Sequence, residues 1–486
     1  MTVVLDGAGL SLLDLAAVAR DGEQVALSPE AREQMLASRQ VVEEALAREE
    51  PVYGLTTGVG ERKRAFVSSA DRLRFNRELV SSHRVAQGKV APRDVVRGAM
   101  LCLANGLAKG AAGVRPQLVE MLVSLLNEGY VASVRRLGSV GEADLGAMAD
   151  LAHGMLEHTG FELAANEGLA LLSNNAFATA WSGLQLVDTA QMLSTLDVAA
   201  ALDLEAFAAN VTALHPIIAE TRMYLGLGST IERLRVLLEG SYLFKANAAR
   251  NLQDPLTFRC IPQVHGGARD TISYARSVLE TELNSSQGNP VVVLAERRVV
   301  SVGNFDAGQL AAALDFVRIA LAPVVTSANE RAVKLLQAPF SGLASGLTAE
   351  PGTAATGLAE LAILVQSLAV EARTLAHPVS YELASSTKGE GIEDRTTMAP
   401  LSARRLADML DLTARVVAIE LVVACQAVDL RQARPLGTGT THAYLAVREL
   451  VPFTATDSAF PADLEPVVEL VKSGGIDVPA EKRSRL

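Results

Sequence analysis

Gly138-Ser139-Val140-Gly141-Glu142-Ala143-Asp144-Leu145 is the most informative stretch of this 486-residue chain. Its glycines favour a turn, two carboxylates follow, and an apolar pattern with helical spacing then covers residues 145–156. Negative side chains before a helix complement the partial positive charge of its N-terminus. Glu142 and Asp144 therefore have two open roles: they complement the end of this helix, or they bind a cation.

The composition favours a protein built from closely packed helices. Hydrophobic residues make up 49% of the chain and aromatic residues only 4%, so Ala, Leu and Val must form the core. Apolar residues recur at helical spacing over 309–334, 356–376 and 402–431. We expect an all-α fold with a helical N-terminal domain carrying active-site loops (1–190), then a central bundle of long helices and a C-terminal helical segment (191–486).

Charge and cysteine usage exclude several classes of function. A net charge of −11 and a pI near 5.3 argue against nucleic-acid binding. Cys102, Cys260 and Cys425 lie in apolar stretches without paired spacing, which predicts reduced thiols in the cytoplasm. The N-terminus lacks the features of a secretory signal, and the apolar run 416–428 is too short to cross a membrane. No metal-binding motif occurs, so we expect no metal.

Nine further short motifs follow one another at characteristic intervals between residues 50 and 435. They are Tyr53-Gly54-Leu55-Thr56-Thr57-Gly58-Val59-Gly60, Ser82-His83, Glu167-Gly168-Leu169-Ala170-Leu171-Leu172, Arg259-Cys260-Ile261-Pro262-Gln263-Val264, Glu282-Leu283-Asn284-Ser285, Asn289-Pro290, Gly303-Asn304-Phe305, Glu393-Asp394 and Ile419-Glu420. Together with 138–145 they resemble the aromatic amino acid lyases, the family of histidine, phenylalanine and tyrosine ammonia-lyases. The resemblance implies a histidine ammonia-lyase-like (fumarase/aspartase-like) helical fold. It also implies a small amino acid substrate and a homotetramer in which three chains build each active site.

The motif at 138–145 departs from this family at its chemical centre. Family members read Gly-Ser-Val-Gly-Ala-Ser-Gly-Asp-Leu, and their Ala-Ser-Gly cyclises and dehydrates into the electrophile methylidene-imidazolone (MIO). Here Glu142-Ala143 replaces that tripeptide with one residue deleted, and neither residue can lose water to give a dehydroalanine. We therefore expect no MIO and no other cofactor.

The resemblance assigns roles to four residues outside this motif, and Lys388 stands five residues before one of them. Tyr53 is the base that removes the substrate β-proton, which requires a lowered pKa. Arg259 clamps the substrate carboxylate with two parallel hydrogen bonds. His83 and Glu393 match the histidine-specific branch, in which a carboxylate binds a ring N–H. Lys388 either adds a charge over the same ring or is a solvated loop lysine.

Further positions near the missing electrophile have also changed. Ser173 replaces the Asn that holds MIO, Leu256 replaces a Tyr, and Asp306 replaces the His after Gly-Asn-Phe, whereas Asn304 is kept as a substrate-binding residue. These changes together indicate that the amine pocket was rebuilt for another leaving group. Asp306, like Glu142 and Asp144, either binds a cation or has a local structural role.

A quaternary ammonium substrate would explain the changes. Trimethylammonium has no lone pair with which to attack MIO, and it departs as a neutral amine without activation. We therefore predict an MIO-independent carbon–nitrogen lyase that releases trimethylamine from a histidine betaine such as hercynine or ergothioneine, similar to the ergothionase type of the family. The alternatives are an MIO-free lyase acting on another activated amino acid, a catalytically inactive homologue, and an ordinary histidine ammonia-lyase.

Overall fold

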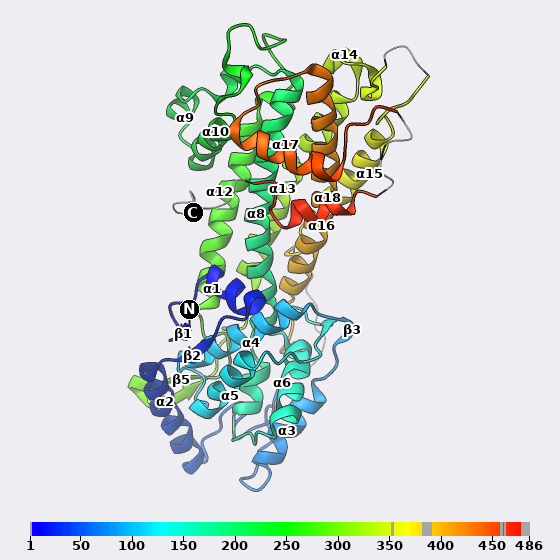
Figure 1. Cartoon of the computed structure of the whole chain (residues 1–486). Helices are drawn as coiled ribbons and strands as arrows, with labels where there is room; N and C mark the ends of the chain where they lie inside the picture. The colour runs from blue at the N-terminus through cyan, green and yellow to red at the C-terminus, as the bar shows by residue number, and fades with distance from the viewer. Residues whose placement is uncertain (1, 351–353, 382–390, 457–459, 461–462, 478–486) are drawn as a thin grey trace. The chain divides into compact units, whose positions relative to one another are not determined.

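The computed structural model describes residues 2–350, 354–381, 391–456, 460 and 463–477, so Lys388 lies outside the described residues. The described chain is mostly helical, as the composition predicted, with three two-stranded sheets (Figure 1). By its internal contacts the chain divides into two compact units. The first comprises Met1–Val187, Tyr274–Asp315 and Pro378–Arg404, and the second comprises Asp188–Ser273, Phe316–His377 and Arg405–Leu486.

The first unit holds short helices and all three sheets. Its elements are β1 (Val3–Leu5), α1 (Leu12–Ala16), a π-helix (Ala17–Asp21), β2 (Val25–Leu27), α2 (Pro29–Ala47), a 3₁₀ turn (Gly60–Arg62), α3 (Arg72–Ser82), β3 (Gln87–Val90), α4 (Arg93–Ala108), α5 (Pro116–Asn127), β4 (Arg135–Leu137), α6 (Leu145–Thr159), α7 (Glu167–Leu172), β5 (Val291–Val293), a 3₁₀ turn (Leu294–Glu296) and β6 (Arg298–Val300). Strands β1 and β2 pair in parallel, whereas β3–β4 and β5–β6 are antiparallel.

The second unit holds further short helices. They are α9 (Ile217–Thr221), α10 (Leu225–Leu237), α11 (Leu256–Arg259), α14 (Ala338–Ser341), α15 (Leu361–Thr374), α17 (Thr438–Leu450) and α18 (Glu465–Lys472), with 3₁₀ turns at Val211–Leu214, Tyr242–Phe244 and Ser345–Leu347.

Four long helices contribute residues to both units. They are α8 (Ala176–Phe207), α12 (Ile261–Leu283), α13 (Gly308–Leu335) and α16 (Ala399–Arg431). Because each of these helices is shared between the two units, the units differ from the contiguous domains, divided at residue 190, that the sequence suggested. The patterns over 309–334 and 402–431 correspond to α13 and α16, whereas the pattern over 356–376 yields a shorter helix, α15.

Local sequence signals explain where several helices begin. Ser28 caps α2 by accepting a hydrogen bond from the Ala31 amide, and Pro29 occupies its first position. Ser11 and Asp14 form a reciprocal capping box at α1. Helix α8 instead has apolar residues on all sides and is buried over most of its length, as expected for a helix at the centre of a core.

Helix α13 is the only helix in the described part of the chain that is long and apolar enough to cross a membrane. Within the structure, 61% of its most apolar window is buried. The central helix of a soluble protein has the same properties, so length and apolarity alone do not indicate a membrane span.

Candidate functional site

The loop of residues 138–144 is held from one side by the segment 395–398. The Met398 amide donates to the Val140 carbonyl at 2.8 Å, and the Thr397 hydroxyl donates to the Gly141 carbonyl at 2.8 Å. Gly141 has a φ of +81°, and a Cβ at this position would lie 2.1 Å from Thr397 Oγ1. Only glycine fits this conformation and this close approach.

Two other segments of the first unit also bind the loop. The Asp144 amide donates to the Asn174 carbonyl at 2.8 Å, and the Ala143 amide donates to the Phe305 carbonyl at 3.3 Å. Asn175 donates its side-chain amide to the same Phe305 carbonyl at 2.6 Å. Ala143 has a φ of +60°, a left-handed conformation that costs about 1 kcal/mol or more for a residue with a Cβ. The strain is maintained by these contacts.

Asp144 has a structural role that differs from the one its position suggested. Its side chain makes no capping bond to α6, the helix it precedes. One carboxylate oxygen instead accepts from Ser139 Oγ at 2.7 Å, and the other accepts from the Ala178 amide in the first turn of α8 at 2.7 Å. The side chain is fully buried, and this burial raises the pKa of Asp144 to about 6. Asp144 therefore binds a helix N-terminus rather than a substrate.

Glu142 and Asp306 lie opposite each other, because their backbones form an antiparallel bridge. Asp306 accepts from the Gly308 amide at 2.8 Å, at the start of α13, and its other carboxylate oxygen lies 3.4 Å from an Arg395 nitrogen. Glu282 is close enough for Asp306 to contribute to its raised pKa, although burial is the larger cause. Asp306 is thus paired with Glu142 through the backbone and lies within electrostatic range of Glu282.

Tyr53 is positioned by a loop that packs on α7. A Cβ at Gly54, where φ is +69°, would lie 2.2 Å from Leu169, so the loop approaches the helix closely. The Gly60 amide donates to the Tyr53 hydroxyl oxygen at 2.9 Å. Burial raises the pKa of Tyr53, the Gly60 bond opposes this effect, and the negative charge of Glu393 adds to it. The expected lowering of this pKa is therefore wrong for the single chain, in which burial and a nearby carboxylate outweigh the one hydrogen bond.

His83 and Glu393 also belong to the first unit. His83 ends α3, and its Nδ1 lies 2.8 Å from the Leu79 carbonyl oxygen. A carbonyl only accepts hydrogen bonds, so this contact assigns the proton to Nδ1 and leaves Nε2 of the neutral ring as an acceptor. Glu393 is exposed and acts electrostatically on Tyr53, which brings the predicted base and a predicted ring contact into one region.

The remaining predicted residues are placed differently. Ser173 is buried at the C-terminal end of α7, directly before Asn174. Asn304 is exposed and donates its side-chain amide to the Ser286 carbonyl at 3.2 Å. Arg259 is exposed at the end of α11 and belongs to the second unit, so it is not part of the group that the first unit assembles.

Five residues with a role in this site were not predicted from the sequence: Asn174, Asn175, Glu282, Arg395 and Thr397. The Ser-Asn-Asn run before α8 was a detectable signal, because side-chain amides satisfy backbone groups at helix ends. Arg395 and Thr397 stand among the changed neighbours of Glu393, and their partners lie far away in sequence.

The residues present do not fit MIO. Positions 142 and 143 carry a carboxylate and a methyl group, and the Ser139 hydroxyl is bonded to Asp144. The loop therefore lacks the Ala-Ser-Gly sequence from which the family forms the electrophile. Across the described ranges, no group of three or more His, Cys, Asp or Glu side chains is placed to hold a metal ion.

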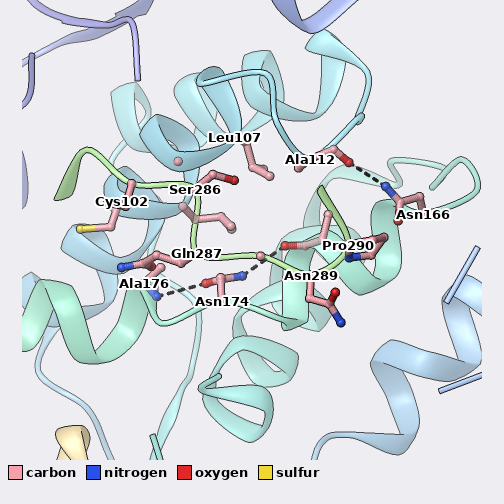
Figure 2. A pocket seen from close by; sticks show the side chains of 15 residues that line it. Cys102, Leu107, Ala112, Asn166, Asn174, Ala176, Ser286, Gln287, Asn289 and Pro290 are labelled. Atoms are coloured by element: carbon pink, nitrogen blue, oxygen red, sulfur yellow. Dashed lines mark hydrogen bonds between the residues drawn. The ribbon is translucent and has the colours of Figure 1, made fainter. Parts of the chain in front are cut away.

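A small cavity lies beside the loop contacts, and none of the predicted site residues lines it (Figure 2). It is bordered by Cys102 and Leu107 of α4, by Asn166 and Asn174, and by residues 285–290. Asn166 donates to the Ala112 carbonyl at 2.7 Å, and Asn174 accepts from the Ala176 amide at 3.1 Å. The cavity has a volume of 30 Å³, which holds about two water molecules and is too small for an amino acid.

Comparisons with known proteins agree on one family. The family model described as aromatic amino acid lyase matches residues 10–449. The histidine ammonia-lyase of Natranaerobius thermophilus is 32% identical, with 98% of both chains covered, and that of Symbiobacterium thermophilum is 34% identical, with 98% of this chain and 97% of the relative covered. The crystal structure of ergothionase from Treponema denticola, in complex with desmethyl-ergothioneine sulfonic acid, has a TM-score of 0.93 at 28% identity, with 98% of this chain and 99% of that chain covered.

Proposed function

The chain belongs to the aromatic amino acid lyase family, and we propose that it is an MIO-free lyase that expels trimethylamine from a betaine of histidine. Its family and relatives make it a carbon–nitrogen lyase acting on a small, histidine-like amino acid. The proposal concerns the leaving group, and it rests on one observation. The loop that supplies the electrophile in this family carries Glu142-Ala143 in place of a serine-containing tripeptide, and bonds from three separate segments fix its conformation.

The elimination needs no electrophile when the nitrogen is quaternary. The Cβ–H bond breaks and its proton goes to the Tyr53 phenolate, while its electron pair forms the Cα–Cβ double bond. The Cα–N bond breaks at the same time, and its pair stays on nitrogen, so the amine leaves neutral. A primary ammonium lacks this advantage because it can lose a proton and become a neutral amine, whose departure would require an amide anion. A covalent adduct makes the nitrogen a better leaving group in that case.

Glu142 is the carboxylate proposed to face the trimethylammonium group. Asp144 is fully buried against α8, and Asp306 is already committed to the start of α13 and to Arg395. Glu142 lies in the loop itself and is half-buried, so it is partly accessible. The nearby Asp306 and Glu282 strengthen the negative potential around a bound cation.

The imidazole ring is proposed to contact Glu393 and the acceptor nitrogen of His83. Both residues lie in the unit that holds Tyr53, and Glu393 already interacts electrostatically with it. The carboxylate is proposed to bind Arg259 of another copy of the chain, because a homotetramer that shares its active sites would bring an exposed arginine to a neighbouring site. A positive charge from that arginine would also lower the pKa of Tyr53.

A substrate panel tests the reaction. Purified protein is incubated with histidine, hercynine and ergothioneine, and the acrylate product is followed by its absorbance while the released amine is identified. The expected result is trimethylamine from one or both betaines and much slower release of ammonia from histidine. Release of ammonia from histidine, with no trimethylamine from either betaine, would contradict the proposal.

Two measurements test the absence of the electrophile directly. The intact mass should equal the sequence mass without the loss of two water molecules. Borohydride and cyanide, which react with MIO, should leave turnover unchanged. Inactivation with a covalent adduct on residues 141–144 would overturn this part of the proposal.

The curated relatives favour a second candidate, a histidine ammonia-lyase activity, since those at 32–34% identity carry that name. A Glu142→Gln variant separates the two functions. An attraction between a carboxylate and a cation is worth ~1–3 kcal/mol, so the variant should bind hercynine roughly 5- to 150-fold more weakly. Its affinity for histidine should fall by a smaller factor. Asp306→Asn is the matched comparison, because Asp306 already lies 3.4 Å from an Arg395 nitrogen, so its loss should weaken hercynine binding less than the loss of Glu142. An equal loss for both ligands in Glu142→Gln would favour the second candidate.

A further inference from the structure

Helix α11, which carries Arg259, is anchored by one buried side chain and exposes two others. Phe258 is 1% exposed and stacks on Phe207, with ring centroids 4.1 Å apart. Leu256 is 60% exposed, and Arg259 is exposed as well. A helix of four residues has too few internal hydrogen bonds to fix its own orientation, so its contacts with the core determine where Arg259 points.

A second anchor reaches α11 from α13. Arg331 is fully buried, and one of its terminal nitrogens donates to the Thr257 carbonyl at 3.3 Å. Its remaining donors bind Asp203 at 2.8 Å and Glu420 at 2.7 Å, both of which are also fully buried. The planar guanidinium holds its donors in a fixed fork, so the two carboxylates set the direction of the arm that reaches Thr257.

We propose that Arg331 is a positioning residue for Arg259, and that Asp203 and Glu420 orient Arg331 for this task. The inference rests on the proposed function, in which Arg259 binds the substrate carboxylate. Thr257 is two residues from Arg259, so a shift of its carbonyl would move the start of the Arg259 side chain. Bidentate binding of a carboxylate tolerates little displacement.

The chemistry of the cluster favours such a role. Removing three charged groups from water is costly, and packed apolar residues of similar volume often give equal or greater stability. Burial and the neighbouring Glu420 raise the pKa of Asp203, and the positive charge of Arg331 opposes this rise. What an apolar replacement would lack is the directed bond to α11.

The test compares two ligands that differ only at the carboxylate: 3-(imidazol-4-yl)propionate and its carboxamide, with affinities measured by calorimetry on the full-length protein. The wild type should prefer the carboxylate by roughly tenfold or more, as expected for a charge-assisted bidentate contact. Arg259→Gln should abolish this preference. Arg331→Lys, which keeps the positive charge between Asp203 and Glu420 but loses the directed arm, should reduce the preference by roughly fivefold or more.

Arg318→Lys is the matched control. Arg318 also lies on α13 and is fully buried, but it donates to the backbone carbonyls of Leu375 and His377 instead of to α11. A general loss of stability would affect both lysine variants and both ligands alike, so the carboxylate preference should stay unchanged in Arg318→Lys. Phe258→Leu weakens the other anchor of α11, the stacking of Phe258 on Phe207, and should also reduce the preference for the carboxylate ligand. It provides a second test in case Arg331→Lys does not fold.

The outcomes separate the two hypotheses. An unchanged preference in Arg259→Gln would show that Arg259 is not the clamp, which is a failure of the proposed function. A loss in Arg259→Gln, with a wild-type preference in folded Arg331→Lys, would overturn the positioning role alone. A loss in both Arg259→Gln and Arg331→Lys, but not in Arg318→Lys, would support it. Where Arg331→Lys does not fold, the preference of Phe258→Leu decides in the same way.

Discussion

Tyr53 governs the expected pH dependence of the reaction, because a phenol must lose its proton before it accepts one from the substrate. Burial and Glu393 both raise the pKa of Tyr53, so the deprotonated form becomes more abundant as the pH rises towards this raised value. Turnover should therefore increase from neutral to alkaline pH. The measurement is a profile of kcat against pH for the wild type, with Tyr53→Phe as the inactive reference.

Glu393→Gln should move this profile in a defined direction. Removing the negative charge lowers the pKa of Tyr53, so the rising limb of kcat should shift to lower pH, even if binding of the imidazole ring weakens. The kcat profile is the appropriate measurement, since it reports groups in the enzyme–substrate complex. If the rising limb of kcat in Glu393→Gln stays at the pH of the wild type, the electrostatic contact between Glu393 and Tyr53 is contradicted.

Asp144 makes a separate prediction about stability. Its pKa is raised from 3.8 to about 6, which corresponds to about 3 kcal/mol at about 1.4 kcal/mol per pKa unit. A raised pKa in the folded state means that the contribution of Asp144 to stability is present below pH 4 and is lost as the pH rises to 6. Asp144→Asn, which does not ionise, should gain up to about 3 kcal/mol relative to the wild type between pH 4 and pH 7. Urea unfolding of both proteins at the two pH values measures this change, and a constant difference would show that Asp144 ionises normally.

At the scale of elements, the loop of residues 138–144 depends on its contact with the segment 395–398. Gly141→Ala combines a left-handed backbone with a Cβ placed 2.1 Å from Thr397 Oγ1, so the loop must move away from that segment. We expect a loss of roughly 2–4 kcal/mol in stability and of most of the turnover.

Gly160→Ala is the control for backbone strain alone. Gly160 ends α6 with a φ of +65°, and a Cβ there would meet no atom within 4 Å. This variant should lose only about 1 kcal/mol and keep its activity. Equal effects of the two substitutions, measured by urea unfolding and turnover, would mean that the contact with Thr397 is unimportant.

At the scale of the whole molecule, the second unit exposes apolar side chains near Arg259 in sequence. Met223, Leu225 and Leu252 are 85%, 85% and 90% exposed in the single chain. Large apolar side chains that a single chain leaves this exposed become buried when copies of the chain associate. The protein should be a homotetramer by light scattering, with a mass roughly four times the 51.2 kDa of one chain.

The interface can be tested together with activity. Met223→Glu combined with Leu252→Glu should dissociate the tetramer and abolish turnover, because Arg259 would no longer reach a neighbouring site. Leu13→Glu, at a 68% exposed position of α1 in the first unit, is the control and should leave both unchanged. A dissociated but active double variant would show that one chain builds the complete site.

The sequence alone determined the family, the helical fold and the loss of the serine on which the electrophile depends. These properties are local: motif order identifies the family, apolar spacing predicts α13 and α16, and a residue that is absent cannot form a dehydroalanine. Arg331 illustrates what such patterns omit, because helical spacing places it on a buried face but does not say that its side chain reaches α11.

Only the tertiary structure decided what surrounds each carboxylate of the loop. Glu142 and Asp144 stand two residues apart and looked equivalent, yet the Asp144 side chain binds the Ala178 amide, 34 residues away, while Glu142 lies opposite Asp306. The direction of the Tyr53 pKa shift likewise depends on burial and on Glu393, 340 residues later in the chain. Burial and contacts between distant segments arise only when the chain packs. They set the dielectric environment and the hydrogen-bond partners of each group, and these in turn determine its charge and its chemistry.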